Sequence, residues 1–580
     1  MDDFGGANAL ATAPRQKIWQ YPDALNLDLL DRIPLDAATV LDVGCGTGAL
    51  GAAYKRLNPN ARVLGIEANA AAARVAARRI DQVAVADIET GVLPFDLPQG
   101  IDCLVYGDVL EHLRDPWEVL SRHVHLLAPG GMLLACIPNV EHWSFAARLM
   151  QGHWDYAETG LLDRTHLRWF TRQTAERALI EAGLVIVDRL SRVFDADLAT
   201  GFVAAIKPAL AALGADAQDY ESRAIPLQYV WRARWQKPEA LTIVSTMLAP
   251  VGGVSQVRVL DPLRCLSSQP GVVTLVSNGR ELPSIDHDVA KIFVFHRPAL
   301  TGPSALRTIG ALVARNYVIV TEFDDHPDYI PVLQRDDMYN FRAVHAVQTT
   351  TEALAEVLRR DNDEVMIFPN GIHMLPEIRN YSQKSRLSLF FGGLNRQGDW
   401  SPYIEALNAV AEKVGGRLHF SIVHDSALFE ALRTPHKNFV PTLDYASYLH
   451  LLSQSELSFM PLSDTPFNRT KSDLKFIEAA ACRVTALASP VVYADTIEDG
   501  RTGILFRDPL ELQSRLLELI ANFDLSRSIG DSARAWVASR RMLAYQTTAR
   551  LAWYRSLWER RAELTDALLS RMPQLARYRS

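Results

Sequence analysis

The stretch Asp42-Val43-Gly44-Cys45-Gly46-Thr47-Gly48 decides the fold at the start of the chain. It continues the apolar run 39–43, which has the length and composition of a buried strand, and a helical pattern begins near Ala49. Glycines in such a turn let the backbone bend tightly and approach a ligand, while the helix N-terminus offers N–H groups without intrahelical partners. The spacing is G-x-G-x-G rather than the G-x-G-x-x-G of dinucleotide folds. NAD is therefore not the favoured ligand and is kept as the alternative.

Short apolar runs alternate with helical patterns along nearly the whole chain, which predicts a parallel α/β architecture. One series of apolar runs ends near residue 137, a second extends from 241 to 368, and a third from 387 to 487. Each series has the size of one doubly wound domain. We therefore predict three Rossmann-like domains over residues 1–237, 238–383 and 384–580, the last with a C-terminal helix.

Composition excludes several classes of protein. Sixty basic and 67 acidic residues give the 580-residue chain a net charge of −7, which argues against a dedicated nucleic-acid binder. The five cysteines are scattered without C-x-x-C spacing, so we expect no disulfide framework, no zinc site and a reducing compartment. No apolar run approaches the ~20 residues of a membrane span, and the acidic N-terminus is unlike a signal peptide. These features predict a cytoplasmic protein.

The segment from Leu551 to Ser580 is predicted to be a basic helix. Such a helix is compatible with weak peripheral contact to anionic lipid at the inner face of the plasma membrane. The favoured alternative is a solvated helix packed on its own domain.

Acidic side chains follow successive strands of the first domain. Glu67 ends the second strand, where a carboxylate can accept both hydroxyls of a ribose. Asp87 and Ile88 follow the third strand and suit an adenine amino group and ring face. Asp108 and the pair Glu111-His112 follow the fourth strand.

Together these motifs, over about residues 17–235, resemble the class I S-adenosylmethionine-dependent methyltransferases. The resemblance implies that the glycine loop cradles the methionine part of the cofactor. It also implies that the acidic residue after the second strand holds the ribose, and that the pair after the third strand frames the adenine. The cofactor-binding residues expected on this basis are Asp42, Gly44, Cys45, Gly46, Gly48, Glu67, Asp87, Ile88 and Asp108.

Methyl transfer to oxygen needs a positioned nucleophile and often a base. Glu111 and His112 lie near the expected cofactor pocket and look like a pair found in ubiquinone-type O-methyltransferases. The stretch 139–166 is rich in histidine and aromatic residues, which fits an acceptor wall on which a sugar ring could stack. His142 and His166 are the candidate bases, and the alternative is that they only cap or hydrogen-bond within loops. We predict no metal.

The second half of the chain has its own ligand-binding pattern. A second glycine loop, Gly252-Gly253, follows the run 241–246. Lys471, Lys475 and Glu478 have i, i+4, i+7 spacing and would share one helix face. Two ammonium groups can bind a diphosphate and the carboxylate a ribose, while the alternative is a solvated, salt-bridged face.

These elements, with Pro369-Asn370-Gly371 between the second and third domains, resemble the GT-B glycosyltransferases over about residues 240–560. The resemblance implies a nucleotide-sugar donor between the two domains, with Lys475 at the phosphate and Glu478 at the ribose. Donor binding would also involve Gly252, Gly253, Lys471 and Arg396. The chain departs from the family at Thr470, where a first glutamate is usual, and at Arg483 and Thr485, where glycine and proline are usual.

An acidic cluster, residues 324–328, follows the strand-like run 317–320. Asp325 or His326 is expected to act on the acceptor side or as a base. The alternatives are a divalent cation held by the carboxylates and a plain turn with a helix cap.

The sequence thus predicts a bifunctional enzyme that methylates a sugar hydroxyl and adds a sugar to a growing surface polysaccharide or O-antigen-type glycan. Its partners would be a glycan or glycolipid acceptor and a nucleotide sugar. One alternative is a methyltransferase with a catalytically degenerate glycan- or nucleotide-binding GT-B module. Another is an O-methyltransferase and glycosyltransferase that act on a quinone or aglycone.

Overall fold

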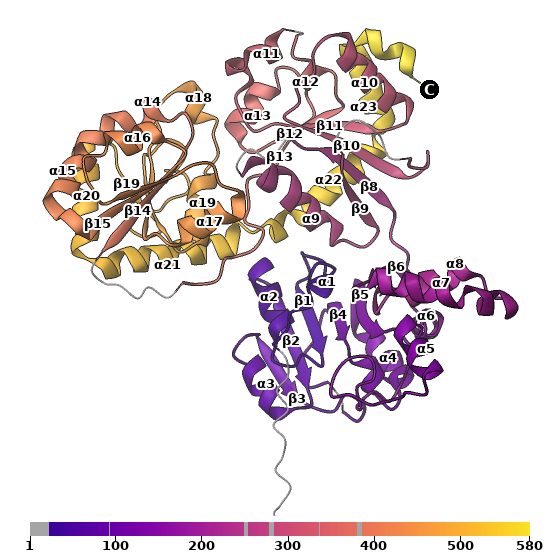
Figure 1. Cartoon of the computed structure of the whole chain (residues 1–580). Helices are drawn as coiled ribbons and strands as arrows, with labels where there is room; N and C mark the ends of the chain where they lie inside the picture. The colour runs from indigo at the N-terminus through magenta and orange to yellow at the C-terminus, as the bar shows by residue number, and fades with distance from the viewer. Residues whose placement is uncertain are drawn as a thin grey trace, which may run out of the picture.

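A computed structural model describes residues 23–91, 93–248, 253–277, 284–335, 337–379 and 386–579. Three separate sheets follow one another along the described chain, and each forms the centre of its own unit (Figure 1). The predicted α/β architecture of three Rossmann-like units is confirmed. None of the helices in the described ranges combines the length and the apolar character that crossing a bilayer requires.

The first sheet has the strand order β3-β2-β1-β4-β5-β7-β6, in which β7 is antiparallel to both neighbours. Neighbouring side chains of β1 enter different core clusters, Val40 one and Leu41 the other, so both faces of the sheet are buried. Strand order reverses between β1 and β4, and this switch point is where ligands bind in open α/β sheets. The strands are β1 (Thr39–Val43), β2 (Arg62–Glu67), β3 (Gln82–Val85), β4 (Ile101–Gly107), β5 (Leu127–Pro138), β6 (Val185–Arg192) and β7 (Gln228–Arg234).

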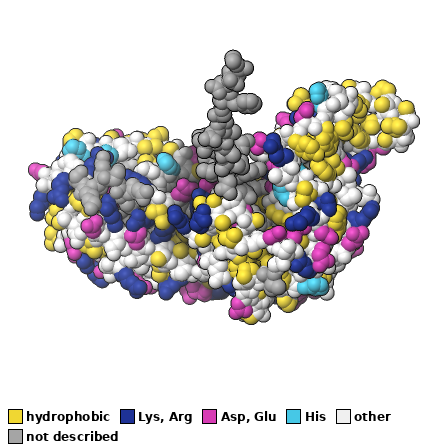
Figure 2. Space-filling view, turned by 90° about the horizontal axis from the view of Figure 1, so that it is seen from below, with side chains coloured by type: hydrophobic (Ala, Val, Ile, Leu, Met, Phe, Trp, Pro, Cys, Tyr) yellow, Lys and Arg dark blue, Asp and Glu magenta, His cyan; other side chains and the backbone are white. Residues whose placement is uncertain are grey.

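The helices of this unit include a projecting pair. α7 and α8 pack on each other through a small cluster of Val203, Leu210 and Ala224. Figure 2 shows hydrophobic side chains gathered on this projecting pair. The helices are α1 (Leu27–Leu30), α2 (Ala49–Leu57), α3 (Ala70–Ala76), α4 (Pro116–His123), α5 (Trp143–Met150), α6 (Arg172–Glu181), α7 (Ala196–Ala212) and α8 (Ala217–Ala224).

The second sheet is parallel, with the order β13-β12-β11-β10-β8-β9. Its strands are β8 (Leu241–Thr246), β9 (Val272–Ser277), β10 (Ala290–His296), β11 (Val318–Glu322), β12 (Ala346–Thr349) and β13 (Val365–Ile367). The helix predicted after the second glycine loop begins as a π-helix, η3 (Gln256–Leu260), and continues as α9 (Asp261–Ser267). The other helices are α10 (Gly302–Ala314), α11 (Pro331–Gln334), α12 (Tyr339–Arg342) and α13 (Glu352–Leu358).

The third sheet is also parallel, with the order β16-β15-β14-β17-β18-β19. Its strands are β14 (Leu387–Gly392), β15 (Leu418–Val423), β16 (Lys437–Val440), β17 (Leu457–Met460), β18 (Thr485–Ala488) and β19 (Ile504–Leu505). Its helices are α14 (Gln397–Trp400), α15 (Ile404–Val414), α16 (Ser426–Ala431), α17 (Tyr445–Ser453), α18 (Pro466–Arg469), α19 (Leu474–Ala481), α20 (Pro509–Ala521) and α21 (Phe523–Arg540).

The C-terminal helices return to the second sheet (yellow in Figure 1). They are α22 (Thr547–Glu559), α23 (Arg561–Arg571) and the 3-10 helix η8 (Pro573–Tyr578). Trp553 and Tyr554 lie in one core cluster with side chains of β8 and β10, and Leu568 lies in another with side chains of α10. The prediction that this segment packs on the third unit is therefore wrong, because its large apolar side chains are buried against the second. Two of its arginines are engaged there too, Arg560 with Glu364 and Arg571 with the Val344 carbonyl.

The first and second units are joined by direct hydrogen bonds. The Leu35 amide donates to Ser268 Oγ at 3.0 Å, and Arg232 Nη1 donates to the Ser268 carbonyl at 2.8 Å. Asp36 accepts from Gln269 Nε2 at 2.7 Å and from Thr548 Oγ1 at 2.5 Å. The loop before β1 is thus anchored both to the residues after α9 and to α22.

Candidate functional site

The glycine loop lies between β1 and α2, at the switch point of the first sheet. Gly44, Gly46 and Gly48 all have positive φ, at 70°, 54° and 77°. A Cβ at Gly44 would lie 2.5 Å from Val109 Cγ2, so only glycine fits this turn. The amides of Gly44 and Cys45 donate to the Ile66 carbonyl at 2.8 and 3.0 Å, which ties the loop to β2.

Glu67 holds the same loop from the end of β2. Its Oε2 accepts from the Gly46 amide at 2.9 Å and its Oε1 from the Asn69 amide at 2.8 Å. A carboxylate offers about four acceptor sites, so these two bonds are compatible with binding a ribose hydroxyl. Burial, and then the charge of Glu67, raise the pKa of the neighbouring Asp42 to about 7.

The other predicted cofactor residues differ in their surroundings. Asp87 is half-exposed and caps its own turn by accepting from the Glu89 amide at 2.9 Å. Ile88 is buried in the core cluster under the sheet. The Cys45 thiol is buried, and a Cβ at Gly65 would lie 2.6 Å from its Sγ, so it packs on that glycine. Asp108 has φ of 55° and accepts from Gln228 Nε2, and burial raises its pKa.

The structure brings three of the predicted catalytic residues together. Glu111 and His112 lie on the 3-10 helix η1 (Leu110–His112) after β4, and His166 lies in the loop that precedes α6. One ligand atom of each residue lies within 4.8 Å of those of the other two. Burial, and then the charge of Asp108, raise the pKa of Glu111 well above its ordinary value.

An open hollow of about 590 Å³ adjoins this group. His166 lines it together with Tyr156, Arg164, Leu167 and Trp169. The walls are mainly aromatic and apolar, with one guanidinium, which is the composition expected where a ring-shaped acceptor stacks.

His142 is placed apart from that group. It is the N-cap residue of α5, its Nδ1 lies 2.8 Å from Ser144 Oγ, and its ring packs on Trp143 at 5.7 Å. Burial lowers its pKa to about 4. These contacts favour the alternative given for His142, a histidine that hydrogen-bonds within its own loop.

In the third unit, the predicted helix face is only partly correct. α19 begins at Leu474, so Lys471 lies in the loop before it. Ser472 is bonded to Asn370 Nδ2 at 2.8 Å, and Asp473 pairs with Arg541 at 2.5 and 2.8 Å. These bonds hold the preceding residues out of the helix, and only Lys475 and Glu478 share its face.

Half-buried Lys475 and buried Glu478 lie one helical turn apart on α19, and Lys475 reaches the carboxyl end of β14. Lys475 Nζ donates to the Gly392 carbonyl. Burial lowers the pKa of Lys475 to about 8 and raises the pKa of Glu478 to about 7. Shifts of this kind, caused mainly by desolvation, are common where a charged ligand binds.

The acidic cluster of the second unit is bonded directly to the third unit. Asp325 Oδ1 accepts from Lys471 Nζ at 2.9 Å, and Arg297 lies 3.8 Å from Asp325 Oδ2. Burial opposes ionisation of Asp324, but its ion pair with Arg297 lowers its pKa. Thr351 Oγ1 also donates from the second unit to the third, to the Thr470 carbonyl at 3.0 Å.

His326 caps η4 (Pro327–Tyr329), where its Nδ1 accepts from the Asp328 amide at 3.3 Å. Burial lowers its pKa. The alternative of a turn with a helix cap therefore describes His326, whereas Asp325 contacts Lys471 of the third unit.

The remaining donor candidates are placed as follows. Gly252 lies outside the described residues, while a Cβ at Gly253 would lie 2.6 Å from Tyr445 Cδ2 of α17. Arg396 Nη1 donates to Asp399 Oδ2 at 3.1 Å and Asn468 Oδ1 at 3.3 Å. Sequence patterns did not single out Tyr445, because nothing in α17 shows that it reaches the second glycine loop.

Two family models match the chain: a methyltransferase domain over residues 41–133 and glycosyl transferases group 1 over residues 385–522. A ubiquinone biosynthesis O-methyltransferase from Dinoroseobacter shibae is 30% identical over 198 residues, which are 31% of this chain and 78% of that enzyme. The N-terminal part of the chain therefore belongs to the class I methyltransferases, and its C-terminal part contains a GT-B group 1 glycosyltransferase domain. Domains of these two kinds imply use of S-adenosylmethionine and of a nucleotide sugar.

Other similarities cover smaller shares. A 37.1 kDa protein in transposon TN4556 of Streptomyces fradiae is 32% identical over 142 residues, 24% of this chain and 39% of that protein. This chain therefore spans well under half the length of that relative. The structure of sucrose-phosphate synthase from Thermosynechococcus elongatus has a TM-score of 0.40 and 15% identity, over 55% of this chain and 100% of that one.

At the departures from the glycosyltransferase pattern, the structure shows what the substitutes do. Thr470 Oγ1, at the place of the first glutamate, donates to the Phe467 carbonyl at 3.0 Å. Arg483 has φ of 64°, the conformation for which glycine is favoured, and it pairs with Asp531. Thr485 Oγ1 donates to the Ser526 carbonyl at 2.5 Å.

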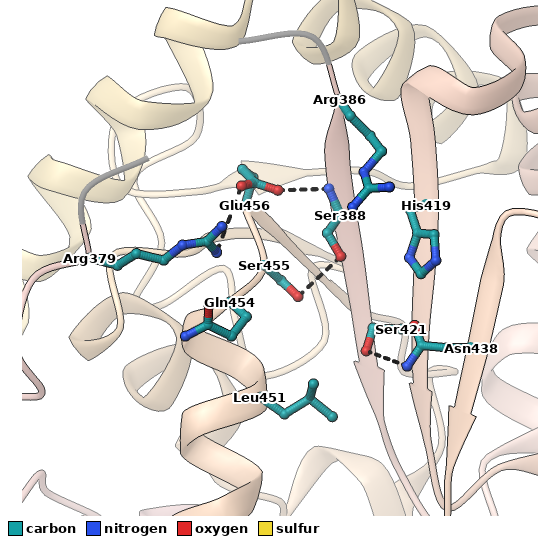
Figure 3. Close-up of a pocket in the computed structure, with 10 residues that line it drawn as sticks. All are labelled: Arg379, Arg386, Ser388, His419, Ser421, Asn438, Leu451, Gln454, Ser455 and Glu456. Carbon is teal, nitrogen blue, oxygen red and sulfur yellow. Dashed lines mark hydrogen bonds and ion pairs between the residues drawn. The ribbon is translucent and has the colours of Figure 1, made fainter. Parts of the chain in front are cut away.

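A polar pocket of about 200 Å³, which sequence patterns did not reveal, lies near the amino ends of the strands of the third sheet (Figure 3). Ser388, His419 and Asn438 stand near the amino ends of β14, β15 and β16, away from Lys475 and Glu478. Glu456 accepts from the Ser388 amide at 2.7 Å and lies 4.0 Å from Arg379. Because ligands of such sheets bind at the carboxyl ends of the strands, we assign this pocket no part in donor binding.

Proposed function

We propose that the chain is a bifunctional enzyme of surface-polysaccharide or O-antigen-type glycan synthesis. Residues 1–237 would transfer a methyl group from S-adenosylmethionine to a sugar hydroxyl. Residues 238–383 and 384–580 would form the acceptor-side and donor-side domains that transfer a sugar from a nucleotide sugar. Each half would thus modify the same glycan.

One observation carries the proposal: in both halves, the charged groups suited to the two ligands lie at the carboxyl ends of parallel strands. Glu67 ends β2 and holds the Gly46 amide of the first glycine loop. Lys475 binds the carbonyl of Gly392, the last residue of β14. Open α/β sheets bind their ligands at this edge.

In the methyltransferase domain, the glycine loop would face the methionine part of the cofactor and Glu67 the ribose. Asp87 and Ile88 would frame the adenine. The sugar acceptor would occupy the hollow lined by Tyr156 and Trp169, next to His166. Stacking of a sugar ring on an aromatic side chain fits these walls.

In the glycosyltransferase domains, Lys471 and Lys475 would bind the diphosphate of the donor and Glu478 its ribose. Lys471 is paired with Asp325 in this structure, so the diphosphate would take the place of that carboxylate. Asp325 would then be released to act on the acceptor side.

Two alternatives have specific support. Thr470 replaces the usual first glutamate, and its hydroxyl donates to the Phe467 carbonyl. This favours a GT-B module that binds a glycan or nucleotide without turnover. The mainly aromatic and apolar walls of the hollow would also suit a quinone or aglycone as methyl acceptor.

Calorimetric titration of the full-length chain tests the proposal. The ligands are S-adenosylhomocysteine, NAD, and the diphosphates of uridine, guanosine, adenosine and thymidine. We expect S-adenosylhomocysteine and one diphosphate to bind, with independent stoichiometries of one. Glu67→Ala should weaken only the first at least tenfold, and Lys475→Ala only the second, because each removes a group from a different unit.

Leu510→Ala, at an exposed position of α20, is the matched control and should change neither affinity. Binding of S-adenosylhomocysteine alone would instead favour the alternative of a methyltransferase with a catalytically degenerate GT-B module. Loss of both ligands in a folded Glu67→Ala protein would contradict two separate sites.

A further inference from the structure

Glu111, His112 and His166 have the composition and spacing of a metal site, although the sequence assigned them to acid–base roles. One ligand atom from each lies within 4.8 Å of those of the other two. Ligands of a single ion, each at about 2.0–2.3 Å from it, are separated by roughly 3 to 4.5 Å. The group is therefore only slightly wider than a filled coordination sphere.

The backbone builds this convergence. The amides of Leu167 and Arg168 both donate to the Glu111 carbonyl, at 2.8 and 2.9 Å. These bonds hold the loop that carries His166 against η1. As a result, the rings of His112 and His166 meet with centroids 4.8 Å apart and planes at 68°.

Hydrogen bonds on the far side of each ring set its tautomer. Thr165 Oγ1 donates to Asp163 Oδ1 at 2.6 Å, so it can only accept from His112 Nδ1, which lies 3.0 Å away. The Nδ1 of His166 lies 3.2 Å from the Leu161 carbonyl, which is also only an acceptor. Each neutral ring therefore carries its proton on Nδ1 and keeps the lone pair on Nε2. Metal-binding histidines are oriented by this kind of bond.

Glu111 supplies the independent observation. Its side chain is 1% exposed, and within the described ranges neither of its carboxylate oxygens has a hydrogen-bond partner. A buried carboxylate in that state is unfavourable unless a cation compensates it. Asp108, three residues earlier, adds a second acidic group nearby. A divalent cation would neutralise the charge of both carboxylates, and the lone pairs of the two imidazoles could coordinate it.

We infer that Glu111, His112 and His166 bind one divalent first-row transition ion, such as Mn²⁺, Co²⁺ or Zn²⁺, which positions the acceptor hydroxyl for methylation. Two imidazoles with one carboxylate suit such ions better than Mg²⁺ or Ca²⁺. Three protein ligands leave further coordination positions open, as in catalytic metal sites. His166 also lines the hollow with Tyr156 and Trp169, so an acceptor there is within reach of the ion.

The chemistry rests on the methyl transfer proposed above. Coordination lowers the pKa of the acceptor hydroxyl, and the proton released when its O–H bond breaks passes to solvent. The oxygen forms a bond to the methyl carbon of S-adenosylmethionine. The carbon–sulfur bond breaks with its electron pair on sulfur, which yields S-adenosylhomocysteine. Two neighbouring open positions on the ion would accept two adjacent oxygens, so the acceptor class is a vicinal diol, as in many sugars.

Metal binding is tested directly on the full-length, tag-free chain, stripped with EDTA and titrated with Co²⁺. We expect one equivalent to bind and to give visible absorption bands of a nitrogen- and oxygen-ligated ion. Glu111→Gln and His166→Gln should each weaken Co²⁺ binding at least tenfold. His142→Gln is the matched control for Co²⁺ binding, because His142 lies in the same domain but contacts Ser144 and Trp143 instead.

S-adenosylhomocysteine affinity, measured on the same samples, keeps the two proposals separate. Unchanged affinity in Glu111→Gln and His166→Gln shows that the domain is folded. Failure of S-adenosylhomocysteine to bind the wild type, with Co²⁺ bound, would overturn the proposed methyl transfer but not the metal site. If the folded wild type takes up no stoichiometric Co²⁺, Mn²⁺ or Zn²⁺, or if Glu111→Gln and His166→Gln bind as the control does, the metal site is refuted.

Discussion

If Lys475 binds the donor diphosphate as proposed, its protonation state controls donor binding. Burial lowers its pKa to about 8, and its ammonium is the form that binds phosphate. If only that form binds, the dissociation constant of the diphosphate identified by titration should rise roughly eightfold between pH 7.5 and pH 9. Glu478, with a pKa of about 7, is mainly ionised over this range and adds little to the change.

Lys475→Arg provides the comparison, because a guanidinium keeps its charge throughout this range. We expect its diphosphate affinity to be nearly independent of pH, as measured by calorimetry in buffers of matched ionic strength. An equally steep rise in the arginine variant would show that another group titrates.

At the scale of single residues, the sequence showed which side chains are candidates for a site, but not which of them come together in space. Glu111 and His112 were recognisable from their place after a strand. His166 is 54 positions after His112, and tertiary bonds such as those of the Leu167 and Arg168 amides to the Glu111 carbonyl bring it there. Likewise, no pattern shows that Asp473 pairs with Arg541, or that α19 begins only after Lys471.

Among the elements, α22 should stabilise the second unit rather than the third. Trp553 is 5% exposed and packs edge-on against Phe368 with ring centroids 5.4 Å apart. Trp553→Ala should therefore lower the free energy of unfolding of the second unit by about 3–5 kcal/mol, the usual cost of removing a buried tryptophan. Urea unfolding followed by hydrogen exchange would assign the loss to a unit.

Leu510→Ala, at a position 77% exposed on α20, should change stability by less than about 0.5 kcal/mol. Selective loss of protection in the third sheet of Trp553→Ala, with the second sheet unaffected, would contradict the packing described for α22.

Strands were predictable where both faces of the sheet are buried. The bounds of β1, β8, β15 and β17 match predominantly apolar runs in the sequence, because a strand covered on both sides is mainly apolar. β16 is an edge strand with Lys437 and Asn438, and β6, another edge strand, is mainly polar after Val187. Neither is apolar along its whole length, and both were missed. Which unit the C-terminal helices pack on depends on tertiary contacts, and the local periodicity of their sequence does not show it.

For the whole molecule, Asp36 is one of the residues that couple the methyltransferase domain to the second unit, beside Leu35 and Arg232. It accepts from Gln269 at 2.7 Å and from Thr548 of α22 at 2.5 Å. S-adenosylhomocysteine at about 100 times its dissociation constant stabilises the domain that binds it by about 2.7 kcal/mol. We expect differential scanning calorimetry to show that the ligand also raises the unfolding temperature of the second unit in the wild type.

In Asp36→Ala, that second effect should disappear while the ligand still stabilises the methyltransferase domain. Glu118→Ala, on the exposed face of α4, is the control that should preserve the coupling. A second unit that still responds to the ligand in Asp36→Ala would place the coupling elsewhere in the interface.

The return of α22, α23 and η8 to the second sheet also has a consequence during synthesis on the ribosome. β8 to β13 are complete at Ile367, yet the helices that cover them begin only at Thr547. At ~5–20 residues per second, translation of the intervening third unit takes on the order of ten seconds or more. During that interval the apolar face of the second sheet is exposed, because α22 and α23 have not been synthesised. A nascent chain stalled before Thr547 should therefore be a preferred client of chaperones.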